Sequence, residues 1–193
     1  AAAAGADVSK PDVSLYAGQA ELSEVIIEYP EPYAVLAPTS AWNAKCWPID
    51  RFTLLAKDLI KNKNIQRIII VGGPGERLHC APLIEFAKGH PQITDRVGST
   101  SIALLMALIA RAKLVVANDS AALHMAVGFK RPLVALLGPT DPKKASPYNR
   151  QADILQHIKE DDEFYFRDNR SAEMIQRITP AEGLNACNTR LNA

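Results

Sequence analysis

The sequence has few cysteines, few aromatic residues, no excess of one charge and no long uninterrupted apolar run. Its 193 residues include only three cysteines, Cys46, Cys80 and Cys187, which lie far apart and form no C-x-x-C pair. This number and spacing indicate neither a disulfide framework nor a zinc site. We therefore expect the chain to work in the reducing environment of the cytoplasm.

The charge balance excludes further classes. Lysine and arginine number 22 and aspartate and glutamate 21, so the formal charge is +1 and a nucleic-acid partner is not expected. The longest apolar stretch, residues 102–117, is interrupted by Arg111 and Lys113. It is also shorter than the roughly 20 residues that a membrane span needs, so no transmembrane segment is expected. A hydrophobic share of 48% and a charged share of 22% are typical of a folded globular chain.

The first ten residues differ from the rest of the chain. They begin with four alanines, and they have neither the basic start nor the sustained apolar centre of a signal peptide. We expect residues 1–10 to be a linker or a poorly defined segment. Residues 11–193 are expected to form one domain.

Four short apolar runs alternate with longer segments that have helical spacing. The runs are typical of buried strands, because they are rich in aliphatic residues and end near proline, glycine or asparagine. Helices are expected over residues 49–61, 76–88 and 121–127, and from a cap at Ser99 or Thr100 to residue 112. The alternation predicts an α/β fold, a Rossmann-like and mostly parallel sheet. The expected strands are Tyr33–Ala37, Ile68–Val71, Leu114–Ala117 and Leu133–Leu137.

The loops that follow these strands are the expected place for a ligand, because open parallel sheets bind ligands at the carboxyl ends of their strands. In the loop 118–120, backbone N–H groups at a helix start would attract an anion such as phosphate. Asp119 there would either cap the helix or bind a sugar hydroxyl, and His124 follows about one turn beyond Ser120. Lys45, in the loop after the first strand, would neutralise a diphosphate. The alternatives are an ordinary Asp cap, a packed core histidine and a solvated lysine.

Other chemistries find less support in the same loops. Ser120 and His124 lack the flanking glycines that a hydrolase nucleophile elbow needs. Residues 72–76 have neither the G-x-G-x-x-G spacing nor the lysine of a P-loop. Cys80 next to His79 has no further metal ligands at suitable spacing. Trp42 and Trp47 would suit stacking on a sugar or a base, and Trp47 before Pro48 is equally typical of a packing anchor.

Together, in this order and spacing, the loops resemble a known family, the lipopolysaccharide heptosyltransferases of glycosyltransferase family 9. This family uses ADP-heptose and has the GT-B architecture of two Rossmann-like domains. The resemblance covers residue 33 to the end and implies the C-terminal, nucleotide-sugar-binding half. It also implies that the N-terminal half, which holds the acceptor and the catalytic base, is absent. The matching pieces are Pro38–Ser40 with Ala44–Pro48, Val71–Glu76, Leu108–Ala112, Asn118–Ser120 with His124, and Gly138–Pro142 with Pro147 and Tyr148.

The resemblance also implies roles for single residues. Lys45 and Asp119 would be the catalytic residues of this half, Lys45 on the diphosphate and Asp119 on the transferred sugar. Glu76 would hold the ribose hydroxyls, and His124 would support the loop at the helix start. The remaining expected substrate-binding residues are Thr39, Ser40, Gly73, Ser120 and Ala121. The sequence departs from the family at Ala121, where glycine is usual, and at Cys46, where a basic or polar residue is common.

The reaction implied is an inverting transfer of heptose from ADP-heptose to the lipopolysaccharide inner core, at the cytoplasmic face of the bacterial inner membrane. No cofactor is implied, and no metal, since the sequence has no D-x-D motif. The isolated half is expected to be inactive as a transferase. Two alternatives stay open: a non-catalytic Rossmann-like binding module, or another GT-B enzyme with a different nucleotide sugar.

Overall fold

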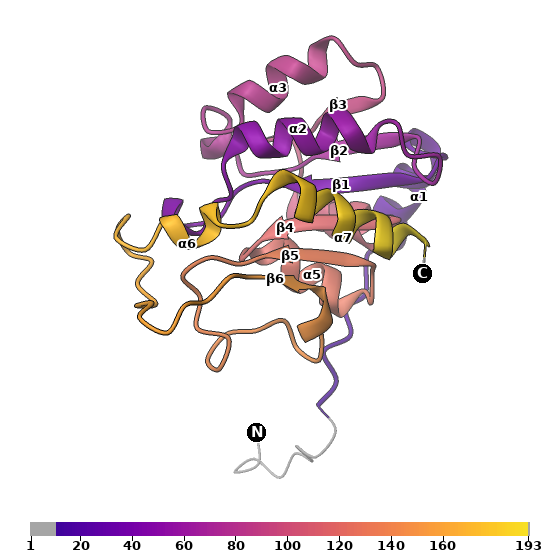
Figure 1. Ribbon diagram of the computed structural model, residues 1–193. Helices are drawn as coiled ribbons and strands as arrows, with labels where there is room; N and C mark the ends of the chain where they lie inside the picture. The colour runs from indigo at the N-terminus through magenta and orange to yellow at the C-terminus, as the bar shows by residue number, and fades with distance from the viewer. Residues whose placement is uncertain (1–10, 193) are drawn as a thin grey trace.

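The computed structural model describes residues 11–192, so the expected linker over residues 1–10 lies outside the described part. One sheet of six parallel strands forms the centre of the molecule (Figure 1). The strands lie in the order β3-β2-β1-β4-β5-β6, which confirms the predicted Rossmann-like α/β fold. Their bounds are β1 Tyr33–Ala37, β2 Arg67–Ile70, β3 Ile93–Asp95, β4 Leu114–Asn118, β5 Leu133–Leu136 and β6 Ile154–Leu155.

Four of these strands, β1, β2, β4 and β5, were predicted from the apolar runs. Both edge strands were missed, because β3 and β6 have only three and two residues and no apolar run marks them. The helices are α1 Gln19–Glu28, α2 Ile49–Leu59, α3 Ala81–Lys88, α4 Ile102–Arg111, α5 Ala121–Gly128, α6 Glu173–Gln176 and α7 Pro180–Asn192.

Two predicted helix starts were wrong. The helix expected from residue 76 begins at Ala81, after a short 3-10 turn at Pro74–Glu76, and Pro82 lies in its first turn. Proline has no N–H to donate and restricts the residue before it, so this first turn is a favourable place for it. The helix expected to be capped by Ser99 or Thr100 is capped by Ser101, whose Oγ accepts a hydrogen bond from the Leu104 N–H at 3.1 Å.

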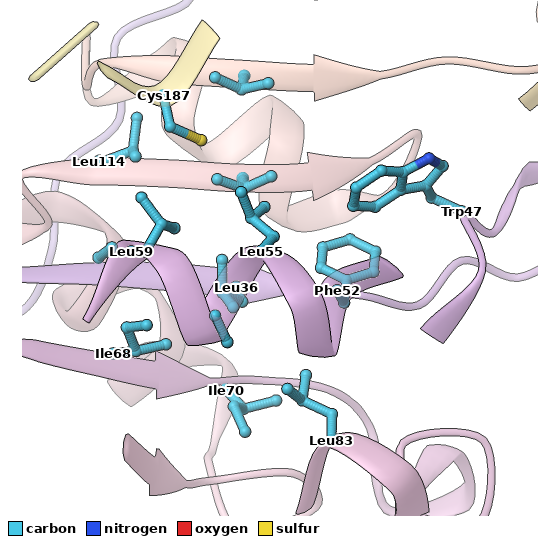
Figure 2. Packing of buried hydrophobic residues seen from close by; sticks show 14 of the residues in the cluster. Leu36, Trp47, Phe52, Leu55, Leu59, Ile68, Ile70, Leu83, Leu114 and Cys187 are labelled. Atoms are coloured by element: carbon cyan, nitrogen blue, oxygen red, sulfur yellow. The ribbon is translucent and has the colours of Figure 1, made fainter. Parts of the chain in front are cut away.

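Helices cover both faces of the sheet. Helices α2, α3 and α7 pack on one face, where alternate strand residues such as Leu36, Ile68 and Ile70 point (Figure 2). Helices α1, α4 and α5 pack on the other face, which receives the intervening residues such as Val35 and Ile69. Both faces of the central strands are therefore buried, which explains why these strands are continuous apolar runs.

Trp47 anchors the loop that follows β1. Its side chain is fully buried, packs edge-to-face on Phe52 with ring centroids 5.1 Å apart (Figure 2), and donates from Nε1 to the Ile178 carbonyl at 2.9 Å. Of the two interpretations from the sequence, the packing anchor is confirmed for Trp47. Because the loop is fixed at this point, Lys45, two residues earlier, is held close to the carboxyl edge of the sheet.

The strand order reverses between β1 and β4. From β1 the chain continues to β2 and β3 on one side, and then crosses to β4, β5 and β6 on the other. The loops after β1 and β4 therefore diverge, and they leave a crevice at the carboxyl edge. Among residues 11–192, no helix is long and apolar enough to cross a membrane.

Candidate functional site

A cavity of about 450 Å³ opens at this crevice, between the loops after β1, β2 and β4 and the start of α4. Its volume is within the range of small-molecule sites, about 300–1,000 Å³. Seven of the nine expected site residues line it: Thr39, Ser40, Gly73, Glu76, Asp119, Ser120 and Ala121. The fold therefore brings most of the expected polar residues together at one cavity.

One end of the cavity is built around the carboxylate of Asp119. Lys45 Nζ lies 2.6 Å from Asp119 Oδ2, and the Thr140 hydroxyl donates to the same oxygen at 2.8 Å. The side chains of Lys45 and Asp119 are only 12% and 14% exposed, so this ion pair is shielded from solvent. We call Lys45, Asp119 and Thr140 the Asp119 cluster. It places a cation and a carboxylate together at the edge of the sheet.

The other polar end of the cavity is built around Glu76. Its Oε2 accepts hydrogen bonds from the Thr39 hydroxyl at 2.7 Å and from the Gly73 N–H at 2.5 Å. Its second oxygen, Oε1, accepts no hydrogen bond from the described residues. We call Thr39, Gly73 and Glu76 the Glu76 turn. It presents a carboxylate oxygen that is free to accept from a ligand hydroxyl.

The start of α5 closes the site below Asp119. Ser120 is the N-cap residue, yet no side chain caps this helix, so Asp119 is not the cap that was one interpretation of the sequence. The Ser40 hydroxyl donates to the Asp119 carbonyl at 2.7 Å, and Asn118 Oδ1 accepts from the Trp47 N–H at 3.1 Å. Because the Ser120 side chain does not cap α5, the N–H groups at the helix start remain available to an anion.

Two expected site residues do not line the cavity. Lys45 reaches it only through Asp119. His124 is 59% exposed in its side chain, lies 3.9 Å from Asp119 Oδ1, and faces a separate apolar hollow beside Val13 and Leu15. Ala121, the departure from the family, does line the cavity, as the first residue of α5.

Two neighbours of the site, one polar and one aromatic, and most of its apolar wall were not predicted from the sequence. Thr140 follows β5 and is 3% exposed, and the ring of Phe166 covers Lys45 Nζ at 4.1 Å. For Thr140 a signal existed, because its loop was among the matching pieces, although no role was assigned to it. The apolar wall formed by Ile102 and Leu105 at the start of α4 follows only from the packing of that helix.

The cysteines do not contribute chemistry to the cavity. Burial raises the pKa of the Cys46 thiol, and burial with the nearby Glu76 charge raises the pKa of Cys80 to about 12. Both sulfurs therefore stay protonated thiols near neutral pH. Within residues 11–192, no three His, Cys, Asp or Glu side chains gather where they would hold a metal ion.

The arrangement suits a ligand with an anionic centre and flanking hydroxyl groups. The ammonium of Lys45 and the helix start offer positive potential at one end, and the two carboxylates offer acceptors for hydroxyls. An apolar wall and a crevice at the reversal of strand order complete this candidate site, in a domain of the Rossmann-like class.

The family follows from comparison with known sequences. The profile of glycosyltransferase family 9 (heptosyltransferase) matches residues 3–174, and the chain belongs to this family. The chain is 33% identical over 109 residues to lipopolysaccharide heptosyltransferase 3 of Escherichia coli K12, a match covering 56% of this chain and 31% of that protein. It is 32% identical over 117 residues to lipopolysaccharide heptosyltransferase 2 of Salmonella typhimurium, covering 60% and 33%.

Solved structures have the same fold. The E. coli ADP-heptose lps heptosyltransferase II superposes with a TM-score of 0.77 and 25% identity, covering 93% of this chain and 53% of that one. A family 9 glycosyl transferase from Veillonella parvula gives a TM-score of 0.74 at 21% identity, covering 97% and 56%. The chain thus spans about half the length of these structures and aligns with about a third of the two curated relatives.

Proposed function

We propose that this chain is the donor-binding part of a heptosyltransferase, which binds ADP-heptose for inverting transfer to the lipopolysaccharide inner core. The observation that carries the proposal is the Asp119 cluster, a shielded lysine-carboxylate pair where the strand order reverses, beside a cavity of nucleotide size. Family membership supports the choice of a nucleotide sugar over other anions.

In the proposed complex the diphosphate lies between Lys45 and the start of α5. Lys45 would share its ammonium between Asp119 and a phosphate oxygen, and the N–H groups of Ser120 and Ala121 would donate to the same group. The base would lie against the apolar wall near Leu105, and the ribose hydroxyls would reach Oε1 of Glu76. The sugar would then lie near Asp119.

The proposed transfer proceeds with inversion, as the resemblance to the family implies. An acceptor hydroxyl attacks the anomeric carbon from the face opposite the diphosphate, the new C–O bond forms, and the bond to the diphosphate oxygen breaks. The hydroxyl proton passes to a base, which the resemblance assigns to the N-terminal half of the family. Negative charge grows on the leaving diphosphate, so Lys45 and the helix-start amides stabilise the transition state more than the ground state.

The donor assignment is tested by calorimetric titration of the purified chain with ADP, UDP, GDP and ADP-heptose at fixed salt. We expect ADP and ADP-heptose to bind and UDP and GDP to bind at least about tenfold more weakly, a difference of about 1.4 kcal/mol. Equal affinity for all three diphosphates would favour another nucleotide-sugar enzyme of the same architecture. No binding by a folded sample would contradict donor binding by this chain and favour a non-catalytic module.

Transfer itself is a separate question. The chain alone is expected to give no heptose transfer, because the proposed acceptor site and base belong to the other half of the family. The acceptor is proposed to be the lipopolysaccharide core, reached from the cytoplasmic face of the inner membrane. Mixing the chain with an acceptor-binding half of a relative, and measuring release of ADP with and without core oligosaccharide, checks this part. Transfer by this chain alone would contradict it.

A further inference from the structure

The segment between β6 and α6, residues 156–172, has no regular helix or strand but is anchored at several points. Gln156 Nε2 donates to the carbonyls of Gly138 and Thr140, each at 2.8 Å. Asp162 accepts two hydrogen bonds from the Arg177 guanidinium, at 2.5 and 2.7 Å. The segment is therefore tied at one end to the loop that supplies Thr140, and in its middle to the residue that follows α6.

The anchored segment places Phe166 on the ammonium of Lys45. Nζ lies 4.1 Å from the centroid of the ring, within the distance of about 6 Å at which an aromatic face attracts a cation. Trp42, three residues before Lys45, packs against the same ring with centroids 5.9 Å apart at 60°. Phe166 is thus held between the loop after β1 and the end of the Lys45 side chain.

The chemistry of this contact differs from that of an ion pair. Among the described residues, Lys45 Nζ donates a hydrogen bond only to Asp119 Oδ2, although an ammonium has three donors. The ring of Phe166 attracts the cation without accepting a conventional hydrogen bond and without adding a negative charge. Because Asp119 already balances the charge of Lys45, a second carboxylate in place of the ring would make the cluster net negative and repel a diphosphate.

We propose that Phe166 is a positioning residue, which holds the Lys45 ammonium beside Asp119 with donors left for the diphosphate of the ligand. The inference rests on the proposed function, since it names the residue that prepares Lys45 for that ligand. A lysine side chain has four rotatable bonds, and restricting them before the ligand arrives lowers the entropy lost on binding. The phosphate affinity of Lys45 therefore depends on a residue of a different segment.

The test compares variants of the purified chain by titration with ADP and with adenosine. We expect Phe166→Ala to weaken ADP binding by about three- to tenfold, because a partly desolvated cation loses its aromatic partner, and to leave adenosine binding unchanged. Phe166→Tyr keeps an aromatic face and should bind ADP within about twofold of the unsubstituted chain. Tyr165→Ala is the matched control: it removes a neighbouring ring that covers Arg170 instead, at 3.9 Å, and should leave both affinities unchanged.

A double-mutant cycle separates positioning from a general effect on the fold. In a Lys45→Met background, Phe166→Ala should cause no further loss of ADP affinity, because the residue it acts through is gone. Loss of adenosine binding in Phe166→Ala, an undiminished effect in the Lys45→Met background, or ADP binding equal to that of the unsubstituted chain would each overturn the inference.

A second readout works without any nucleotide. The ring should shift the NMR signals of the Lys45 Cε protons upfield, and this shift should disappear in Phe166→Ala and persist in Tyr165→Ala. If the unsubstituted chain binds no ADP, the proposed function fails together with the diphosphate role of Phe166. The Lys45 signals then still show whether the ring holds the ammonium, so the two failures are distinguishable. Identical Lys45 signals in all variants would overturn the contact itself.

Discussion

The Asp119 cluster and the Glu76 turn are two carboxylate sites in one cavity, and they differ in what surrounds the charge. Asp119 is paired with a cation at 2.6 Å, whereas Glu76 is held by a hydroxyl and a backbone N–H, neither of which carries charge. The first site is close to neutral overall, and the second keeps its negative charge and a free oxygen. An anionic group is therefore favoured at the Asp119 end, and hydroxyl groups are favoured at the Glu76 end.

The two sites are also assembled differently. Glu76 bonds to Gly73 within one turn, three residues away, so part of its geometry is local. Asp119 and Lys45 are 74 residues apart and meet only because β1 and β4 are neighbours in the sheet. The charge balance at the Asp119 end thus depends on long-range packing, whereas the geometry at the Glu76 end is partly set by the local turn. The following predictions test this contrast in order of decreasing expected effect.

Removing the cation should have the largest effect. We expect Lys45→Met to lower ADP affinity about tenfold to hundredfold, the range for losing a hydrogen bond of about 1.5–3 kcal/mol to a charged group. Calorimetric titration measures this, with Lys57→Met, an exposed lysine on α2, as the control that should leave affinity unchanged. An equal loss in both variants would mean that only the overall charge of the chain matters.

The same substitution should also lower the stability of the free chain, because Asp119 would keep a shielded carboxylate without its cation. The expected decrease in the free energy of unfolding is about 1–3 kcal/mol. Adding Asp119→Asn to Lys45→Met should recover stability but not ADP binding. Denaturant unfolding of the unsubstituted chain and these two variants checks this. Unchanged stability in Lys45→Met would contradict the ion pair as a structural contact.

Asp119→Asn by itself tests whether the Asp119 carboxylate contacts the sugar of the donor. Asparagine still accepts from Thr140 but releases Lys45, so we expect ADP affinity to be retained. The extra affinity of ADP-heptose over ADP should fall about tenfold, or about 1.4 kcal/mol, which is close to the lower bound for losing a hydrogen bond to a charged group. The difference between the two titrations is the measurement. Equal losses for ADP and ADP-heptose would argue against a contact between Asp119 and the sugar.

Glu76→Gln should have a smaller effect. The glutamine oxygen still accepts from Thr39 and Gly73, so stability should change by less than about 0.5 kcal/mol. The charge facing the ribose is lost, and the preference for ADP over 2′-deoxy-ADP should fall about threefold, or about 0.7 kcal/mol. Competition titrations with the two nucleotides measure this. An unchanged preference would mean that Oε1 does not contact the ribose.

A third carboxylate, Asp162, sharpens the comparison because it has a cation partner but lies outside the cavity. Hydrogen bonds from Arg177, and then from the Lys159 backbone, lower the pKa of Asp162 from its usual 3.8 to about 2. A carboxyl whose pKa is lower in the folded state stabilises the fold above the unfolded pKa, and this stability is lost as the pH falls from about 4 through 2.

The measurement is the free energy of unfolding between pH 5 and 2 (roughly the window in which a carboxyl with this shift titrates) for the unsubstituted chain and for Arg177→Gln. We expect the variant to lose less stability over this range than the unsubstituted chain. A parallel fall in stability for the two chains would contradict the assignment to this pair.

Most of the fold could be predicted from the sequence, and the reason is physical. Strands that are buried on both faces must be continuously apolar, so the apolar runs of β1, β2, β4 and β5 identify them in the sequence. The edge strands β3 and β6 are short and half exposed, and nothing in their composition separates them from loops. The exact start of α3 was missed because the proline in its first turn is compatible with several boundaries.

For the candidate site, the sequence indicated which loops and which polar residues lie at the cavity, but not the contacts between them. Thr39 and Asp119 lie just after β1 and β4, and Glu76 ends the 3-10 turn after β2, so all three belong to loops of the carboxyl edge that the sequence pattern locates. Thr140 and Phe166 act through contacts with Asp119 and Lys45, and no spacing in the sequence relates them to these residues. The cap role considered for Asp119 was wrong because the cation of Lys45 and the Thr140 hydroxyl bind its carboxylate instead.

The sequence by itself determined the alternation of strands and helices, the position of the loops along the chain and the family. These features depend on local periodicity and on short motifs, and both can be recognised in the sequence without knowing the fold. Only the tertiary structure decided the partners of each charge: Lys45 with Asp119 and Phe166, and Glu76 with Thr39. Electrostatic and aromatic contacts act over a few ångströms in space, and the folding of the sheet brings distant residues within that range.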